Sequence, residues 1–246
     1  MKNENLFFLF GEESFLVEEE VNALESKYQN FEKNIIPSKY SFDELFSAIS
    51  TGSLFLTPKL ILLKNPWFLF EAINDNEYKK FENILQAIKA NTENRIIIYA
   101  IGKKVDQRKK TVKAVKGNAL CKEFVSFKDW EQSNVLSWLE KRISAQNKTI
   151  TQEALFILEQ IGGTNLRQLA LELEKLVVYL GNRDQITAKD VLVISSANAQ
   201  ASIFHLNEAF KQRQIKKILS IINIMLKNGE DPIRLLALLS SNLRFY

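Results

Sequence analysis

Short apolar runs alternate with longer segments of helical periodicity over the first 130 residues. Each run is rich in β-branched or aromatic side chains and is bounded by polar or turn-forming residues, a pattern typical of buried strands. Strands are expected at residues 6–10, 34–36, 60–63, 96–100 and 120–125. Because helical segments separate them, the pattern predicts βαβ units and a parallel sheet covered by helices on both faces.

In the segments between these runs, apolar residues recur every three or four positions, as in amphipathic helices. Helices are expected at residues 17–28, 42–49, 71–90 and 105–116. Ser41 and Glu44 have the spacing of a capping box at the second helix. The apolar face of that helix is expected to comprise Phe42, Leu45, Phe46 and Ile49. Gly117 is expected to stop the fourth helix.

From about residue 131 the strand pattern gives way to short capped helices. Thr151, Asn165 and Thr187 are predicted N-caps, while the pair Gly162-Gly163 and Gly181 are expected to end helices. Residues 199–203 are small and polar, as in a linker, and helical segments then run to residue 246 without a stop signal. We therefore expect three parts: an α/β domain at 1–130, an all-α domain at 131–199, and the start of a truncated all-α domain at 200–246.

Composition and charge are those of an ordinary globular protein, since 46% of the 246 residues are hydrophobic and 25% are charged. A net charge of +4 permits contact with nucleic acid without requiring it. Cys121 is the only cysteine, which excludes an intramolecular disulfide and favours a reducing compartment. Neither a secretion signal nor an apolar stretch of membrane-spanning length is apparent. We expect a cytoplasmic protein that does not contact the membrane.

The turn after the first predicted strand has the position of a phosphate-binding loop but lacks its residues. Such a loop reads G-x-x-x-x-G-K-[ST], because glycine amides cradle the phosphate and the lysine neutralises it. Here Gly11 is followed by Glu12 and Glu13, with neither a second glycine nor a lysine nearby. Acidic side chains suit a helix N-terminus, but they would repel a triphosphate. The sequence therefore predicts a P-loop-like scaffold without Walker motifs or cofactor, and a role in binding a partner.

Four stretches together resemble a known family. They are FLFGEESFL at 8–16, SLFLTPKL at 53–60, GGTNLRQL at 162–169 running into ELEKL at 172–176, and ITAKDV at 186–191 with FHL at 204–206. Their order and spacing resemble the delta subunit of the bacterial DNA polymerase III clamp loader. Members of that family usually have Asp where Asn165 stands, and Asn caps a helix equally well. Members also continue beyond the position of residue 246 into a full helical collar domain.

The resemblance implies an AAA+-like fold without ATPase motifs, with a lid-like module at 131–199. It also implies a mechanical role in DNA replication: the subunit binds the ring-shaped sliding clamp and opens one interface of the ring. Other subunits, which supply ATP hydrolysis or act as a stator, would be partners, together with the clamp and primed DNA. Two alternatives stay open: a different non-catalytic AAA+-like subunit acting as the stator, and a nucleotide-dependent enzyme with a degenerate P-loop.

The pair Leu54-Phe55 follows Ser53 and lies between Gly52 and Pro58. Glycine and proline on either side predict a loop or a short helix tip rather than the interior of a long element. The resemblance implies that Ser53, Leu54 and Phe55 contact the sliding clamp, with the Leu-Phe pair inserted into an apolar pocket of the ring. The alternative is that Phe55 packs into the core of its own chain.

A second candidate is the basic run with Lys103, Lys104, Arg108, Lys109 and Lys110. Lys113 and Lys116 extend it, while Val105, Val112 and Val115 are expected to anchor it to the core. Such a run is usually a solvated helix face. The functional alternative is contact with DNA phosphates or with an acidic neighbouring subunit, and the aromatic residues that would indicate base stacking are missing from the run itself.

Catalytic chemistry finds little support in the sequence. His205 is the only histidine, and Cys121 lies in a predicted strand, so neither a nucleophilic triad nor a metal cluster of the usual His/Cys type is indicated. Glu12 and Glu13 are carboxylates that Mg²⁺ accepts, but adjacent residues on a helix point apart. We expect no catalytic residue, metal or cofactor in this chain.

Overall fold

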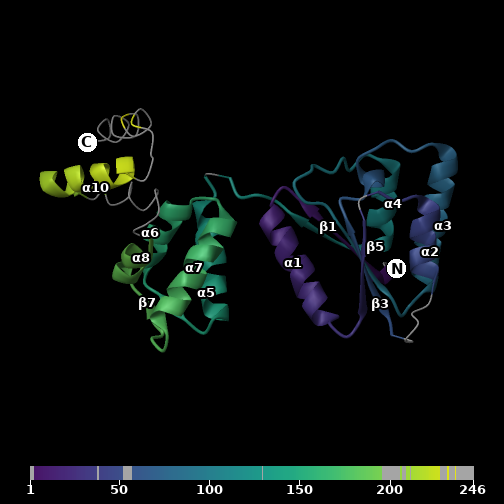
Figure 1. Ribbon diagram of the computed structural model, residues 1–246, viewed down its shortest axis with the longest axis horizontal. Coiled ribbons are helices and arrows are strands. Elements are labelled where there is room, and N and C mark those ends of the chain that lie inside the picture. The colour runs from purple at the N-terminus through teal and green to yellow at the C-terminus, as the bar shows by residue number, and fades with distance from the viewer. Residues whose placement is uncertain are drawn as a thin grey trace. The chain divides into compact units, whose positions relative to one another are not determined.

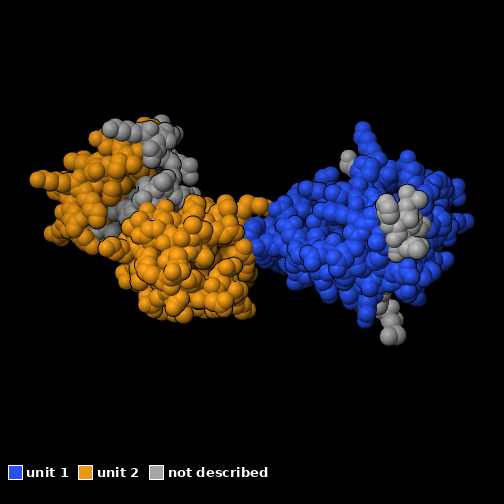
Figure 2. Space-filling model, turned by 60° about the horizontal axis from the view of Figure 1, so that its bottom comes forward, with its two compact units in different colours: residues 1–126 blue, residues 127–246 orange. Residues whose placement is uncertain are grey.

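The computed structural model describes residues 3–37, 39–51, 57–128, 130–195 and 212–227, together with positions 206, 209, 210, 232 and 236. The chain divides into two compact units, Met1–Ser126 and Phe127–Tyr246, which Figure 2 shows in different colours. The division of the second unit into 131–199 and 200–246 stays a prediction, and the predicted linker at 199–203 lies outside the described residues.

The first unit contains a five-stranded sheet in the order β2-β3-β4-β1-β5, in which every neighbouring pair is parallel. Its strands are β1 (Asn3–Gly11), β2 (Glu32–Ile36), β3 (Lys59–Lys64), β4 (Arg95–Tyr99) and β5 (Ala119–Phe124). All five lie where apolar runs predicted them. The parallel sheet is confirmed, and β1, the first strand in sequence, is paired on both sides.

Helices cover both faces of this sheet (Figure 1). On one face lies α1 (Ser14–Lys27); on the other lie α2 (Phe42–Ser50), α3 (Asp75–Ala90) and α4 (Lys110–Asn118), with the 3₁₀ turn η1 at Trp67–Leu69. Successive side chains of a strand point to opposite faces. Phe8 therefore packs in the core beneath α2, α3 and α4, whereas Leu9 packs against α1. This alternation explains why the central strands are apolar throughout.

The predicted capping box of α2 is confirmed. The Glu44 N–H donates to Ser41 Oγ at 3.2 Å, and the Ser41 N–H donates to Glu44 Oε2 at 2.6 Å. These hydrogen bonds from Ser41 lower the pKa of Glu44. The predicted apolar face of α2 is correct for Phe42, Leu45 and Ile49, which are buried, but wrong for Phe46, which is 41% exposed.

Two predicted helix starts are wrong. The helix predicted at 71–90 begins at Asp75, because Asn74 forms a capping box with Glu77 that fixes its first turn. The helix predicted at 105–116 begins at Lys110 and contains Gly117 instead of stopping there. In the latter case Asp106 accepts the Arg108 N–H at 3.0 Å and forms a separate turn before the helix. Val105 is nevertheless buried, as expected of an anchor.

The second unit is built from capped helices around its own core. They are α5 (Gln132–Ala145), α6 (Gln152–Gly162), α7 (Leu166–Leu180) and α8 (Ala188–Ser195). Thr151 and Asn165 cap α6 and α7 as predicted, accepting N–H groups at 3.2 and 3.1 Å. Leu139, Leu158, Leu169, Leu176 and Val191 are fully buried. The all-α character predicted for this region is confirmed apart from one short strand pair.

That strand pair, β6 (Thr149–Ile150) with β7 (Gln185–Ile186), joins the segments that lead into α6 and α8. The Thr151 N–H donates to the Ile186 carbonyl at 3.1 Å, so the N-cap of α6 is tied to the segment that precedes α8. Further along, α10 (Ile215–Lys227) matches the predicted apolar segment, and its Ile218 and Met225 pack with Leu206 and Ala209. Over the part of the chain that the structure describes, no helix is both long and apolar enough to cross a bilayer.

Candidate functional site

The turn after β1, residues 11–14, is packed against β5 so closely that only glycine fits at its start. Gly11 has φ 147°, and a Cβ added there would lie 1.9 Å from the Phe124 carbonyl oxygen. The Glu13 N–H donates to the same carbonyl at 3.1 Å. A backbone N–H that would face an anion in a phosphate-binding loop is therefore bonded to the neighbouring strand.

The side chains of this turn are also engaged within the chain. Glu13 caps α1 by accepting the Phe15 N–H at 3.0 Å, and Ser14 Oγ accepts the Gly102 N–H at 3.1 Å. Glu12 lies 3.5 Å from Lys104. Carboxylates thus occupy the N-terminus of α1, where the helix dipole favours negative charge. These carboxylates stabilise the first turn of α1, and they would repel a triphosphate at the same place.

The predicted clamp-contact residues Ser53, Leu54 and Phe55 lie outside the described residues, but both ends of their segment are described. Thr51 is the C-cap of α2, and its N–H donates to the Ser47 carbonyl at 2.9 Å. Lys59 begins β3 and is only 8% exposed. Its ammonium group donates to the Thr51 carbonyl at 2.9 Å. One partly buried hydrogen bond from a charged group therefore joins the two ends of the segment.

A series of hydrogen bonds through three asparagines begins at the backbone N–H of Lys59. Asn94 Oδ1 accepts the Lys59 N–H at 2.8 Å, and Asn91 Oδ1 accepts the Asn94 N–H at 3.0 Å. Asn5 donates its side-chain amide to the Asn91 carbonyl at 3.0 Å. Lys59, Asn94 and Asn5 are all buried, and buried polar groups of this kind rigidify a site when they are fully paired. Sequence reasoning missed this network, because a single lysine before a strand normally indicates a surface residue.

The closed turn at 11–14 and Lys59 lie at opposite edges of the sheet. Because the strands are parallel, Gly11 ends β1 at the carboxyl edge, whereas Lys59 begins β3 at the amino edge. On the helix that leads into the segment, Phe46 exposes 41% of its surface beside a groove between α2 and α3. An apolar side chain is therefore accessible close to the predicted partner-binding segment.

Four of the five predicted basic residues contact neighbouring groups of the first unit. Lys103 lies 5.1 Å from the ring centre of Phe70, and Lys104 pairs with Glu12. Lys109 donates to the carbonyls of Phe70 and Glu71. Lys110 is exposed at the first position of α4.

Arg108 makes two hydrogen bonds to Asp106, at 3.0 and 3.1 Å. Bonding to Arg108 lowers the pKa of Asp106 to about 2. Most of the predicted charges in the run therefore serve the local structure of the loop before α4. Whether they also contact DNA or another subunit stays a prediction.

Cys121 and His205 are the remaining candidate groups for catalysis. Cys121 lies half-buried in β5, where its Sγ contacts the carbonyls of Lys116 and Ala119. His205 lies outside the described residues. Within the described ranges, no three His, Cys, Asp or Glu side chains are placed to hold a metal ion.

The fold and this geometry define an α/β domain with a parallel five-stranded sheet and a closed turn after β1, followed by an all-α part. Residues 7–125 match the family described as DNA polymerase III, delta subunit, and residues 200–246 match its C-terminal domain. The chain belongs to the DNA polymerase III delta subunit family. The expected family and fold class are thereby confirmed.

Relatives agree with this assignment over nearly the whole chain. DNA polymerase III subunit delta of Bacillus subtilis is 27% identical over 250 residues, covering 97% of this chain and 70% of the relative. A probable DNA polymerase III subunit delta of Aquifex aeolicus is 21% identical, covering 97% and 68%. The solved structure of the Bacillus subtilis DNA clamp loader delta protein has a TM-score of 0.68 at 24% identity, covering 98% of this chain and 73% of that one.

Proposed function

We propose that this chain binds the sliding clamp and opens one interface of the ring, so that the ring can be loaded onto primed DNA during replication. Ser53, Leu54 and Phe55 make the contact, and the chain itself carries out no nucleotide chemistry. ATPase and stator subunits of the same cytoplasmic assembly supply hydrolysis and a rigid support. Opening follows if the chain binds the sprung ring more tightly than the closed ring, since that difference in affinity shifts the equilibrium of the ring.

The observation that carries this proposal is the hydrogen bond from the ammonium group of the buried residue Lys59 to the Thr51 carbonyl. It fixes the ends of the segment that contains Leu54 and Phe55, so less ordering entropy is lost when a partner binds. A Leu and a Phe placed in a partner's pocket contribute roughly 1.5–3 kcal/mol each. Together that is about 3–6 kcal/mol, enough for a binding hot spot.

The closed turn supports the absence of nucleotide chemistry. The Glu13 N–H is bonded to Phe124, and Glu12 and Glu13 place negative charge at the N-terminus of α1. Isothermal titration with Mg-ATP should therefore give no heat of binding. Tight binding of Mg-ATP would instead favour an enzyme with a degenerate P-loop.

The experiment that tests clamp binding compares Phe55→Ala with the wild-type chain on immobilised sliding clamp. We expect Phe55→Ala to weaken binding by about 1.5–3 kcal/mol, or roughly ten- to hundredfold, while its melting temperature stays the same. Phe156→Ala is the matched control, because Phe156 is 54% exposed on α6 in the other unit. A drop of several degrees in the melting temperature of Phe55→Ala would show that Phe55 packs in the core, where its loss costs about 3–5 kcal/mol.

A further inference from the structure

A cleft lies at the carboxyl edge of β2 and β3, where the loops that follow β2, β3 and β4 meet. Lys39, Lys64 and Lys103 line it, together with the rings of Trp67 and Phe70. The three lysines are exposed, and the two rings are partly buried. Glu71 is the one carboxylate among the described lining residues, so positive charge predominates. The cleft combines ammonium groups with aromatic surface.

Hydrogen bonds between loops assemble this cleft from distant parts of the sequence. Asn65, in the left-handed region at φ 47°, donates its side-chain amide to the Ile101 carbonyl at 3.0 Å and accepts the Ile101 N–H at 2.8 Å. These two hydrogen bonds tie the loop after β3 to the loop after β4. It therefore brings Lys64 and Lys103 to the same edge of the sheet.

The rings are fixed in a similar way. Trp67 Nε1 donates to the Tyr40 carbonyl at 3.1 Å, which ties η1 to the segment after β2 and places Lys39 beside it. The Lys103 ammonium lies 5.1 Å from the centre of the Phe70 ring. Trp67, Phe70 and Lys103 are thus held by contacts within the unit before any ligand arrives.

We propose that this cleft binds a nucleic-acid strand. Lys39, Lys64 and Lys103 contact its phosphates, and a base or sugar lies against Trp67 and Phe70. Proteins that track a strand combine a positively charged groove with aromatic side chains in this manner. An acidic peptide would satisfy the lysines equally well, but it would offer no planar partner for the rings. The cleft and the Lys59 network lie at opposite edges of the sheet, so this proposal does not rest on clamp binding.

Only Lys103 of the five basic residues predicted from the sequence belongs to the cleft. Lys39 and Lys64 were not anticipated, because they are isolated in the sequence and only the fold brings them together. The missing aromatic interleaving of the basic run is supplied by Trp67 and Phe70, which precede that run by more than thirty residues.

The test uses Trp67 as a fluorescent reporter in a chain that also carries Trp130→Phe and Trp138→Phe. Titration with single-stranded oligothymidylate should quench the remaining emission, with an affinity that falls steeply with salt concentration. The same titration is carried out with duplex DNA of equal length. Comparing the two affinities shows whether the cleft prefers single-stranded or duplex DNA. The absence of quenching with both probes would overturn the proposal.

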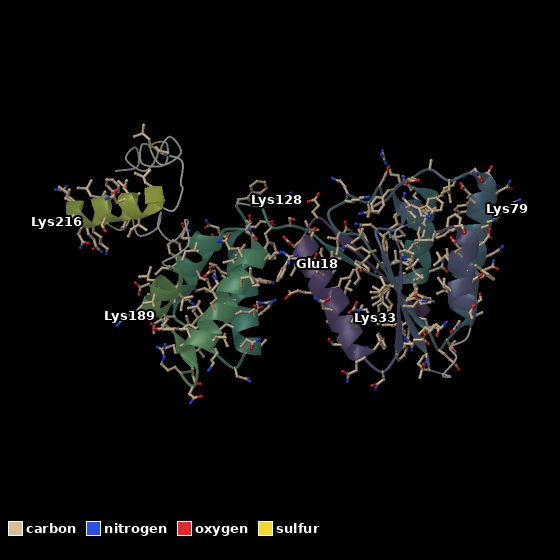
Figure 3. The ribbon with its side chains drawn as sticks, in the orientation of Figure 1. Glu18, Lys33, Lys79, Lys128, Lys189 and Lys216 are labelled. Carbon is tan, nitrogen blue, oxygen red and sulfur yellow. The ribbon has the colours of Figure 1, made fainter. Side chains whose placement is uncertain are left out.

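The decisive variant replaces Lys39, Lys64 and Lys103 by Ala. Each lost phosphate contact should reduce the slope of log affinity against log salt concentration by about 0.7, so three lost contacts reduce it by about 2. Affinity near 0.1 M salt should fall at least about tenfold. Lys79→Ala, Lys89→Ala and Lys141→Ala together form the matched control; all three lysines are exposed, and Lys79 projects from α3 (Figure 3).

Three outcomes would contradict the proposal. They are equal losses in the two triple variants, a loss that follows a lower melting temperature, and displacement of the oligonucleotide by a poly-glutamate peptide at equal charge concentration. The last would show that the cleft binds acidic protein segments.

Discussion

The ammonium group of Lys59 is the most direct target for perturbing the proposed clamp-binding segment. Lys59→Met retains the aliphatic stem in its buried position but removes the hydrogen bond to the Thr51 carbonyl. The hydrogen bond to Asn94 Oδ1 is donated by the backbone N–H of Lys59, so the substitution leaves it in place. The variant therefore isolates the link between the two ends of the 52–56 segment.

Losing this hydrogen bond should change both the free energy of unfolding and the affinity for the clamp. A hydrogen bond to a charged group contributes about 1.5–3 kcal/mol, but Thr51 is exposed, so water replaces the lost donor and unfolding should become easier by only about 1 kcal/mol. For clamp binding, freeing the backbone of one residue costs about 1–2 kcal/mol when the segment is ordered again. Clamp affinity should therefore fall by roughly five- to thirtyfold.

Surface plasmon resonance against immobilised clamp, with thermal denaturation of the same samples, measures both effects. Lys64→Met is the matched control, because Lys64 ends the same strand, loses the same charge and is exposed at the opposite edge. Equal clamp affinity for Lys59→Met and Lys64→Met would refute the reasoning. So would a loss of clamp binding accounted for entirely by unfolded protein.

Two further changes test the described parts of the fold. Gly11→Ala should destabilise the chain by more than about 2 kcal/mol, because its Cβ would meet the Phe124 carbonyl oxygen at 1.9 Å; an unchanged denaturant midpoint would show that the turn is not packed as described. Asp190→Ala should cost about 3 kcal/mol, because Asp190 is buried and pairs with Arg183 at 2.9 Å and Thr187 at 2.7 Å. Burial raises the pKa of Asp190, but hydrogen bonds from Thr187 and Arg183 outweigh it and lower that pKa overall. Its contribution is therefore present above the unfolded pKa of about 3.9 and is lost as pH falls through the folded value, so the acid unfolding profile of Asp190→Ala should lack this component.

The sequence predicted the elements whose pattern is local. The apolar runs identified β1, β3 and β4 because buried strands are apolar on both faces, and Ser41, Thr151 and Asn165 marked helix starts through their own side chains. The starts of α3 and α4 were misplaced because Asn74 and Asp106 redirect the backbone through local hydrogen bonds within otherwise helical patterns. The pairing of β6 with β7 is too short to show any periodicity.

The candidate sites were only partly predictable, because their decisive contacts join distant residues. Nothing near Lys59 in the sequence indicates that its ammonium group bonds to Thr51 or that Asn94 accepts its backbone N–H. Likewise, the cleft depends on Asn65 reaching Ile101 and on Trp67 reaching Tyr40. The closed turn, by contrast, was foreshadowed by Glu12 and Glu13, because the residues that bind phosphate were visibly replaced.

Titrating purified sliding clamp with this chain, once without nucleotide and once with Mg-ATP, measures the proposed nucleotide-independent clamp binding. The wild-type chain should bind the clamp with the same affinity whether or not Mg-ATP is present, and a chain carrying both Leu54→Ala and Phe55→Ala should lose binding while keeping its melting temperature. A clamp that binds both chains equally, or that binds the wild-type chain only when ATP is added, would contradict it.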